Sequence, residues 1–179
     1  GLGNRRLLGE QLAYALERSQ REQTRLAVVL VDLDDFKLVN DSYGHSLGDE
    51  ILKTVASRLA ASVPAADSIA RLGGDEFVLV VHVDALDSLV QQVERLFEAM
   101  REPVELRGMR FVLRMSAGIA LYPADATDAE ALLRQADVDP AKPYRAMLDT
   151  LAGDVHRHLK LAAAVLADLQ PQSRAASGA

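Results

Sequence analysis

Two short acidic segments of this sequence have residue types and a spacing that suit a metal and phosphate site. The first is Gly73-Gly74-Asp75-Glu76-Phe77, between the largely apolar runs 68–72 and 78–81. Two strands joined by so short a glycine-rich connection predict a β-hairpin with its acids at the tip. The second is Asp32, which ends the apolar run 26–31, where a buried strand would present it at the edge of a sheet.

These carboxylates could bind a hard cation together. If the strand 26–32 pairs beside the hairpin, Asp32 and Asp75 converge, and two carboxylates with backbone carbonyls and waters form a Mg²⁺ site that leaves positions for phosphate oxygens. Either acid alone would more often be a solvated turn residue, so the prediction rests on the pair. Residues 32–35 also begin like a Ca²⁺ loop, but no Gly or Glu stands at its sixth and twelfth positions, which makes that interpretation weak.

The polar residues after Asp32 could bind the rest of a nucleotide. Lys37 is spaced to reach phosphates near Asp32, although a solvated lysine would look the same. Asn40 and Asp49 can together recognise guanine, since a carboxylate accepts from N1–H and the N2 amine while an amide bonds O6 or N3. The alternatives are a turn at Asn40 and a first-turn helix acid at Asp49. His45, taken alone, favours a structural role.

The elements that would position these residues form an α/β pattern. Helices and strands alternate with hairpins, which predicts a sheet with helices on its faces. The predicted order begins with a helix that follows an Asn4 cap and runs to about residue 23, a strand at 26–31, and a short helix or turn at 36–43. A helix capped by Ser46, the hairpin, and a helix from Asp84 to Pro103 come next. Two strands around Arg107-Gly108 follow, the second over 110–121, and the last element is a helix capped by Thr127 and Glu130 that ends at Asp137.

The pattern changes after residue 137, where Pro140 and Pro143 interrupt helical periodicity. We therefore expect three parts. The first is a domain over residues 1–143 with an atypical carboxyl end. The second is a C-terminal helix over 144–170, an interface or a linker to a further domain, and the third is a disordered tail over 171–179.

Composition limits the classes of partner. The chain has 179 residues and a formal net charge of −6, which argues against nonspecific nucleic-acid binding. It has no cysteine and no apolar stretch of about 18 to 20 residues, so thiolate metal sites, disulfides and membrane contact by this segment are not expected. Because it opens on Gly1 rather than Met, we expect it to be part of a longer protein. A cytoplasmic location is expected for this segment, with anchoring of the parent protein to a membrane left open.

The segment Asp32-Leu33-Asp34-Asp35-Phe36-Lys37-Leu38-Val39-Asn40-Asp41-Ser42-Tyr43-Gly44-His45-Ser46-Leu47-Gly48-Asp49, followed by the hairpin at 73–77, resembles the GGDEF domains, or diguanylate cyclases. Residues 1–6 and 116–120 also resemble family segments, so the resemblance covers about residues 1–137. It implies a palm-like α+β sandwich similar to nucleotidyl cyclases, with a mostly antiparallel central sheet flanked by helices. It also implies condensation of two GTP into cyclic di-GMP and two pyrophosphates by a homodimer.

The resemblance also implies residue roles. Asp32, the Leu33 carbonyl and Asp75 would hold Mg²⁺ (or Mn²⁺), and Asp75, Glu76 and Lys37 would act in catalysis. The residues implied in GTP binding are Phe36, Asn40, His45, Asp49, Gly73, Gly74 and Lys142.

Two departures from the family pattern leave alternatives open. The inhibitory Arg-x-x-Asp is here Pro64-Ala65-Ala66-Asp67, so its arginine is missing and only Asp67 remains. The usual Gly-Arg-Asn after the last helix is absent, and Lys142 lies between two prolines. A cyclase is the leading hypothesis. The alternatives are a GTP-binding module with weak or no activity that regulates an attached domain, and a dimerisation scaffold. The parent chain is expected to carry sensor or phosphodiesterase domains.

Overall fold

A computed structural model of the chain describes residues 5–63 and 66–137. The expected helix over 144–170, the tail over 171–179, Lys142 and Pro64 lie outside these residues. The elements are α1 (Arg5–Glu22), β1 (Arg25–Asp34), α2 (Phe36–Tyr43), α3 (His45–Ser62), β2 (Ala66–Gly73), β3 (Glu76–Val83), α4 (Leu86–Arg101), β4 (Val104–Leu106), β5 (Met109–Phe111), β6 (Arg114–Tyr122) and α5 (Ala129–Ala136). Within them, no helix is long and apolar enough to cross a bilayer.

The main sheet has the strand order β2-β3-β1-β6, and every pairing in it is antiparallel. β1 is central, with β3 on one side and β6 on the other. The condition on which the metal-site prediction depends, that the first strand pairs beside the hairpin, is therefore met. Asp32 of β1 lies opposite Glu76 of β3 and Ser116 of β6.

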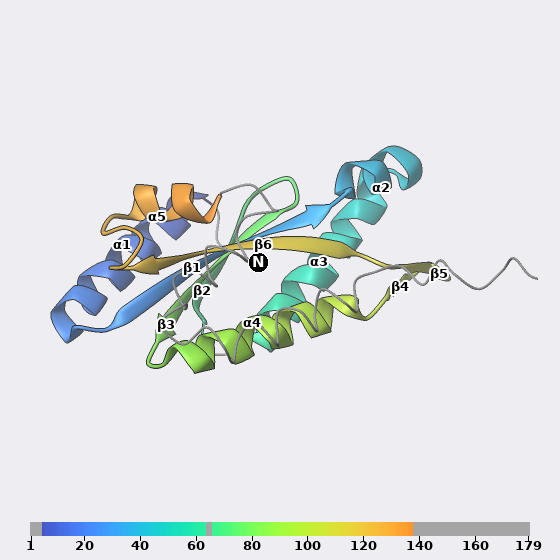
Figure 1. Cartoon of the computed structure of the whole chain (residues 1–179). Coiled ribbons are helices and arrows are strands. Elements are labelled where there is room, and N and C mark those ends of the chain that lie inside the picture. Colours follow the sequence, from blue (N-terminus) through green and yellow to red (C-terminus); the bar gives the residue numbers. More distant parts are fainter. Residues whose placement is uncertain (1–4, 64–65, 138–179) are drawn as a thin grey trace, which may run out of the picture.

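Helices cover both faces of this sheet, with α1 and α5 on one face and α3 and α4 on the other (Figure 1). Alternate residues of β1 enter the two resulting cores, which explains why residues 26–31 are apolar without alternation. The α1/α5 face buries Leu26, Val28 and Leu30, and the α3/α4 face buries Ala27, Val29, Val31 and Leu33. The α+β sandwich is confirmed. The same alternation along β1 places Asp32 and Asp34 on the α1/α5 face.

The predicted strand over 110–121 is wrong as a single element. β5 turns back on β4 around Arg107 (φ 51°) and Gly108 (φ 75°), as predicted for that turn, but β6 starts again at Arg114 and pairs with β1. Residues 112–113 separate the two. Both strands have strand-like sequences, so their periodicity could not reveal that the chain changes partner here.

Two predicted helix caps and one predicted helix start are also corrected. α3 follows Gly44 (φ 84°), and Ser46 lies inside the helix, where its hydroxyl accepts from Arg107 Nη2 at 3.1 Å. α4 follows Ala85 rather than Asp84. α5 is capped by Asp128, whose Oδ1 accepts from the Ala131 N–H at 2.8 Å, rather than by Thr127.

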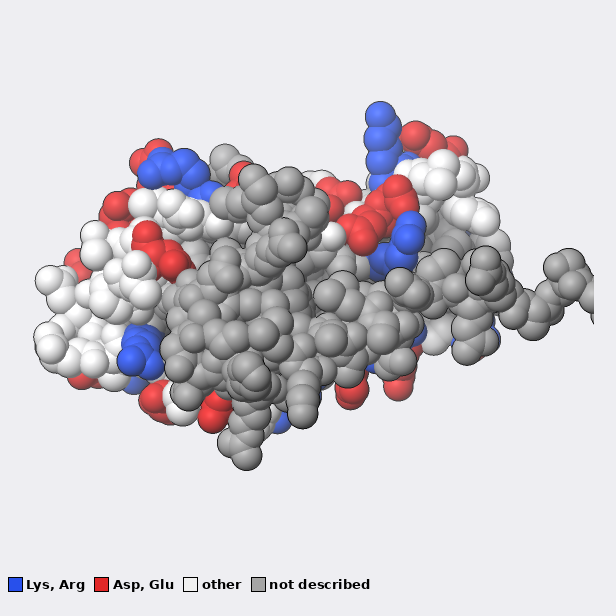
Figure 2. All heavy atoms as spheres, viewed as in Figure 1, with Lys and Arg blue, Asp and Glu red and all other residues white. Residues whose placement is uncertain are grey.

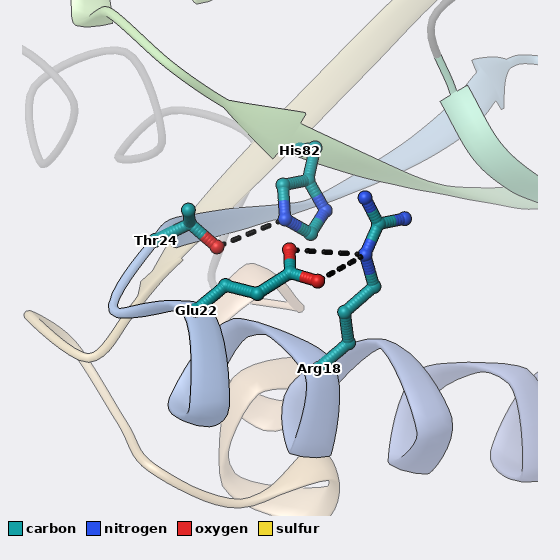
Figure 3. A network of polar contacts seen from close by, with 4 residues as sticks. All are labelled: Arg18, Glu22, Thr24 and His82. Carbon is teal, nitrogen blue, oxygen red and sulfur yellow. Dashed lines mark hydrogen bonds and ion pairs between the residues drawn. The ribbon is translucent and has the colours of Figure 1, made fainter.

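The start of β1, at the end opposite Asp32, is joined to β3 by side chains with a structural role (Figure 3). Thr24 Oγ1 and His82 Nε2 lie 2.9 Å apart, within hydrogen-bonding distance. Beside them on α1, Arg18 Nε donates to both Glu22 oxygens at 3.2 and 3.1 Å. The Thr24–His82 contact joins the α1–β1 turn to the sheet, and the Arg18–Glu22 pair links two successive turns at the end of α1.

Candidate functional site

Three carboxylates gather where β1 ends. Asp32 and Glu76 are cross-strand partners, which places their Cβ atoms about 4.5–5.5 Å apart on one face. Asp75 lies in the turn between Gly73 and Glu76, which are themselves paired. Gly74 adopts φ 53° in that turn, a conformation that glycine accepts without steric cost. The hairpin thereby places the two acids next to Asp32.

Burial and the position of Asp32 in this acidic cluster raise the pKa of its carboxyl group. The pKa of its carboxyl rises from 3.8 to about 6, first because burial disfavours the charged form and then because Asp75 and Glu76 repel it, with smaller effects of Asp34 and Asp137. Among the described residues, no ion pair neutralises Asp32, Asp75 or Glu76. The site therefore holds an excess of negative charge that a bound cation would relieve.

The donor set suits Mg²⁺ (or Mn²⁺) shared with a phosphate ligand. In the described part of the chain, no three His, Asp or Glu side chains converge as a complete metal cage. Two carboxylates leave coordination positions for a carbonyl, water and phosphate oxygens, the arrangement that Mg²⁺ takes in nucleotide sites. Leu33 is buried, with 1% of its surface exposed, so only its backbone carbonyl could contribute.

The charge cluster leads to a prediction about stability. Without metal, Asp32→Asn is expected to raise the free energy of unfolding at pH 7.5 by up to about 1 kcal/mol, after allowance for solvent screening. Since the folded-state pKa is the higher one, protonation of Asp32 favours the fold. That contribution is complete below pH 3.8 and is lost as the pH rises through about 6.

Urea unfolding at pH 4.5 and pH 7.5 measures this effect, with Asp84→Asn at the far end of β3 as the control. The gain from Asp32→Asn should shrink at the lower pH. An equal loss of stability at both values would contradict the prediction.

The chain leaves β1 through a charged turn into α2. Ser116 Oγ donates to Asp34 Oδ1 at 2.9 Å, and Arg114 Nη2 donates to Asp35 Oδ2 at 2.8 Å. In Figure 2, acidic and basic side chains lie together around this end of β1. Lys37 is exposed on the first turn of α2, whereas the Phe36 side chain is buried in the core. Phe36 could therefore contact a ligand through its backbone only.

Asn40 packs directly on α3. A Cβ at Gly48 would lie 2.0 Å from Asn40 Oδ1, so the Asn40 carboxamide occupies the space that a side chain would fill. Asp49, the next residue, is exposed, as is His45 at the start of α3. The structure thus brings Asn40 beside the turn of α3 that carries Asp49, as the guanine hypothesis requires.

Comparison with known sequences decides the family. The profile described as "Diguanylate cyclase, GGDEF domain" matches residues 1–142 of the 179. The chain belongs to the GGDEF family. The predicted resemblance is confirmed.

Curated relatives of this GGDEF domain are longer proteins. It is 43% identical over 136 residues to "Bifunctional diguanylate cyclase/cyclic di-GMP phosphodiesterase MucR" of Pseudomonas aeruginosa, covering 76% of this chain and 20% of that protein. It is 36% identical over 152 residues to "Diguanylate cyclase DgcP" of the same organism, covering 84% and 22%. The chain therefore spans about a fifth of the length of these two relatives.

Solved GGDEF domains share the fold. A sensory box/GGDEF family protein from Caulobacter crescentus superposes with a TM-score of 0.74 at 38% identity, covering 82% of this chain and 95% of that one. The GGDEF domain of YfiN or TpbB from Pseudomonas aeruginosa also gives 0.74, at 32% identity with coverage of 79% and 89%. The expected fold of the family is confirmed by these superpositions.

Two acids that sequence reasoning did not single out, Asp34 and Asp137, lie close enough to raise the pKa of Asp32. Asp34 lies two residues after Asp32 and so shares its face of β1, a period-2 signal that could have identified it. Asp137 has no such signal. It reaches the cluster because α5 packs on β6, and with Glu76 it borders a cavity of about 280 Å³ between α1, α5 and the hairpin.

Gly48 leads to a second prediction. Gly48→Ala would displace the Asn40 carboxamide and is expected to weaken GTP binding about tenfold, the cost of about one lost hydrogen bond. Unfolding should change little, because the Asn40 carboxamide is the end of a flexible side chain and the Phe36 ring, whose Cζ would lie 3.2 Å from the new Cβ, has to yield only slightly. Calorimetry with 3′-deoxy-GTP, which lacks the attacking hydroxyl, measures the affinity.

Asn40→Ala is the matched comparison, and combining the two changes should add little further loss because both remove one contact. Fully additive losses, or unchanged affinity in Gly48→Ala, would contradict this role of Gly48.

Proposed function

We propose that this domain condenses two GTP into cyclic di-GMP and two pyrophosphates at the interface of a homodimer, with Mg²⁺ (or Mn²⁺). The observation that carries the proposal is that the hairpin turn places Asp75 and Glu76 beside Asp32, a proximity that arises only when β1 and β3 pair in the folded sheet. The family membership and the intact segment 32–49 support the same conclusion.

The chemistry requires positioning and charge neutralisation. The 3′-oxygen of one GTP attacks the α-phosphorus of the other, the bond from that phosphorus to the bridging oxygen of pyrophosphate breaks, and the same exchange then closes the ring. A bound Mg²⁺ would neutralise the charge that develops on the phosphates. Asp32, the Leu33 carbonyl and Asp75 would hold it. Asp75 or Glu76 would take the 3′-hydroxyl proton, and Lys37 would stabilise phosphate charge.

The remaining contacts would orient the nucleotide. Asn40 and Asp49 would bind the guanine edge, with His45 close to the nucleotide. A Cβ added at Gly73 or Gly74 would meet no atom within 4 Å, so the space beside these glycines is open and would allow the substrate to approach the backbone. Lys142, which lies outside the described residues, would contact phosphate.

A dimer is part of this proposal. Each domain would hold one GTP, so joining two nucleotides requires two domains whose sites face one another, an isologous arrangement. We retain residues 1–143 as the catalytic domain and 144–170 as an interface or linker. The domain would act in the cytoplasm, within a parent protein that carries sensor or phosphodiesterase domains.

The test is incubation of the purified chain with GTP and Mg²⁺ at several protein concentrations, followed by chromatography. Cyclic di-GMP should form, with a rate per protomer that rises as the dimer forms. No product at high concentration, in this chain and in the full-length parent, would overturn the proposal.

A GTP-binding regulatory module is the second candidate. It is favoured by the segment after Asp137, where Pro140, Pro143 and the absence of Gly-Arg-Asn alter the family's phosphate-binding region. A relative 38% identical to this chain is named "Cyclic di-GMP phosphodiesterase NbdA". Calorimetric binding of GTP without any turnover would favour this function. A dimerisation scaffold would show neither GTP binding nor turnover, and it would become monomeric when residues 144–179 are removed.

Product inhibition is expected to be weak or absent. The position of the family's inhibitory arginine is Pro64, and a bidentate grip on phosphate or guanine needs a guanidinium. Asp67 lies in β2 at a register irregularity between Ala66 and Ser68. Calorimetry with cyclic di-GMP should therefore detect little binding. Tight binding that disappears in Asp67→Ala would contradict this prediction.

A further inference from the structure

The Arg71 side chain hydrogen-bonds to the backbone of the hairpin turn that contains Asp75. Arg71 lies on β2 opposite Phe77 of β3, and its side chain folds over the turn. Arg71 Nε donates to the Gly74 carbonyl at 2.9 Å, and Nη2 donates to the same oxygen at 2.6 Å. Hydrogen bonds from a charged guanidinium are shorter and stronger than neutral ones, so this contact holds the carbonyl firmly.

The bonded carbonyl belongs to the peptide that joins Gly74 to Asp75. Gly74 is free to adopt many backbone angles, so nothing in its own chemistry keeps this peptide in one orientation. A rotation of the peptide would re-aim the Asp75 side chain away from Asp32. Two donors on one carbonyl oppose that rotation, because it would break both bonds.

Arg71 contacts the backbone rather than the acids. Among the described residues, no ion pair joins it to Asp32, Asp75 or Glu76. We propose that Arg71 is a positioning residue, which fixes the Gly74–Asp75 peptide so that Asp75 can share a cation with Asp32. The inference rests on the proposed function for its metal, and it goes beyond it in assigning this role to the guanidinium fork.

Two variants separate geometry from charge. Arg71→Lys keeps the positive charge but lacks the two-donor fork, and Arg71→Met keeps only the apolar stem. Binding of Mn²⁺ in the presence of 3′-deoxy-GTP, followed by electron paramagnetic resonance, reports on the metal site without turnover. Both variants should weaken Mn²⁺ binding about tenfold or more, the usual effect of removing a residue that orients a metal ligand. The NMR signal of the Asp75 amide should also shift in the metal-free protein.

The matched control is Arg58→Met. Arg58 also donates to backbone carbonyls, those of Ala99, Glu102 and Pro103 at the end of α4. Its loss should lower the melting temperature while Mn²⁺ affinity stays within about twofold of the wild type. A global effect of removing an arginine would weaken Mn²⁺ binding in this variant too, and that result would overturn the proposal.

The remaining outcomes are also decisive. If Arg71→Lys keeps full Mn²⁺ affinity, charge rather than the fork is what matters, and the positioning role is wrong. If the wild type binds Mn²⁺ and 3′-deoxy-GTP but makes no cyclic di-GMP from GTP, only the proposed synthesis fails and the Arg71 comparison still holds. A wild type that binds no Mn²⁺ would overturn both.

Discussion

Replacing Asp75 with alanine is expected to lower cyclic di-GMP synthesis by at least about 10³-fold. The change removes a proposed ligand to Mg²⁺ and a candidate proton acceptor, and metal stabilisation of phosphate charge alone contributes several kcal/mol, each 1.4 kcal/mol being about tenfold in rate. Asp75 lies in a turn outside both cores, so the fold should persist. Initial rates at saturating GTP, measured by chromatography of the product, give the ratio.

Asp84→Ala is the control for Asp75. Asp84 follows β3 at the opposite end of the strand, is exposed, and lies outside the acidic cluster. Its replacement should leave the rate within about twofold. If Asp75→Ala retained a tenth of the wild-type rate at an unchanged melting temperature, the proposed metal site would be in the wrong place.

Gly118→Ala should destabilise the fold more than any substitution in the acidic cluster. A Cβ at Gly118 on β6 would lie 1.9 Å from the carbonyl oxygen of Ala136 and 3.0 Å from its carbonyl carbon, in the last turn of α5. Both are backbone atoms, so the helix itself must move. Overpacking of this kind costs about 1–3 kcal/mol, or about 2–12 °C in melting temperature for a chain of this size.

Gly118→Ala should also change the acidic cluster. Asp137 follows the displaced turn of α5 and lies near Asp32, so a shift of that turn would move the Asp137 carboxylate relative to Asp32. Thermal unfolding measures the stability, and Gly9→Ala is the matched control. A Cβ at Gly9 on α1 meets nothing within 4 Å, so this change should stabilise the helix by about 0.5–1 kcal/mol. Unchanged stability in Gly118→Ala would mean that α5 does not pack on β6 at this point.

Much of the fold followed from local patterns. The unbroken apolar run at 26–31 predicted a strand buried on both faces, and β1 is such a strand. Leu47, Ile51 and Leu52 recur at helical spacing in the sequence, and all three are buried on the inner face of α3. Both signals depend on which side chains repeat along one element, and that information is contained in the order of residues alone.

The errors concern features that depend on neighbours from elsewhere in the chain. The pattern of residues 110–121 predicted one strand, but β5 and β6 pair with different partners. Gly44 and Asp128, rather than the predicted Ser46 and Thr127, cap their helices, because a cap depends on the backbone angles at the helix end as well as on residue type.

The sequence by itself determined the family, the hairpin and the identity of the acids, because Gly73 to Phe77 and Asp32 are consecutive patterns with local meaning. Only the tertiary structure decided what surrounds them. The register that sets Asp32 against Glu76, the packing of α5 that brings Asp137 to the same cluster, and the room at Gly48 for Asn40 all join residues distant in the chain. Charge repulsion and steric fit depend on distances in space, and the folding of the sheet and helices sets those distances.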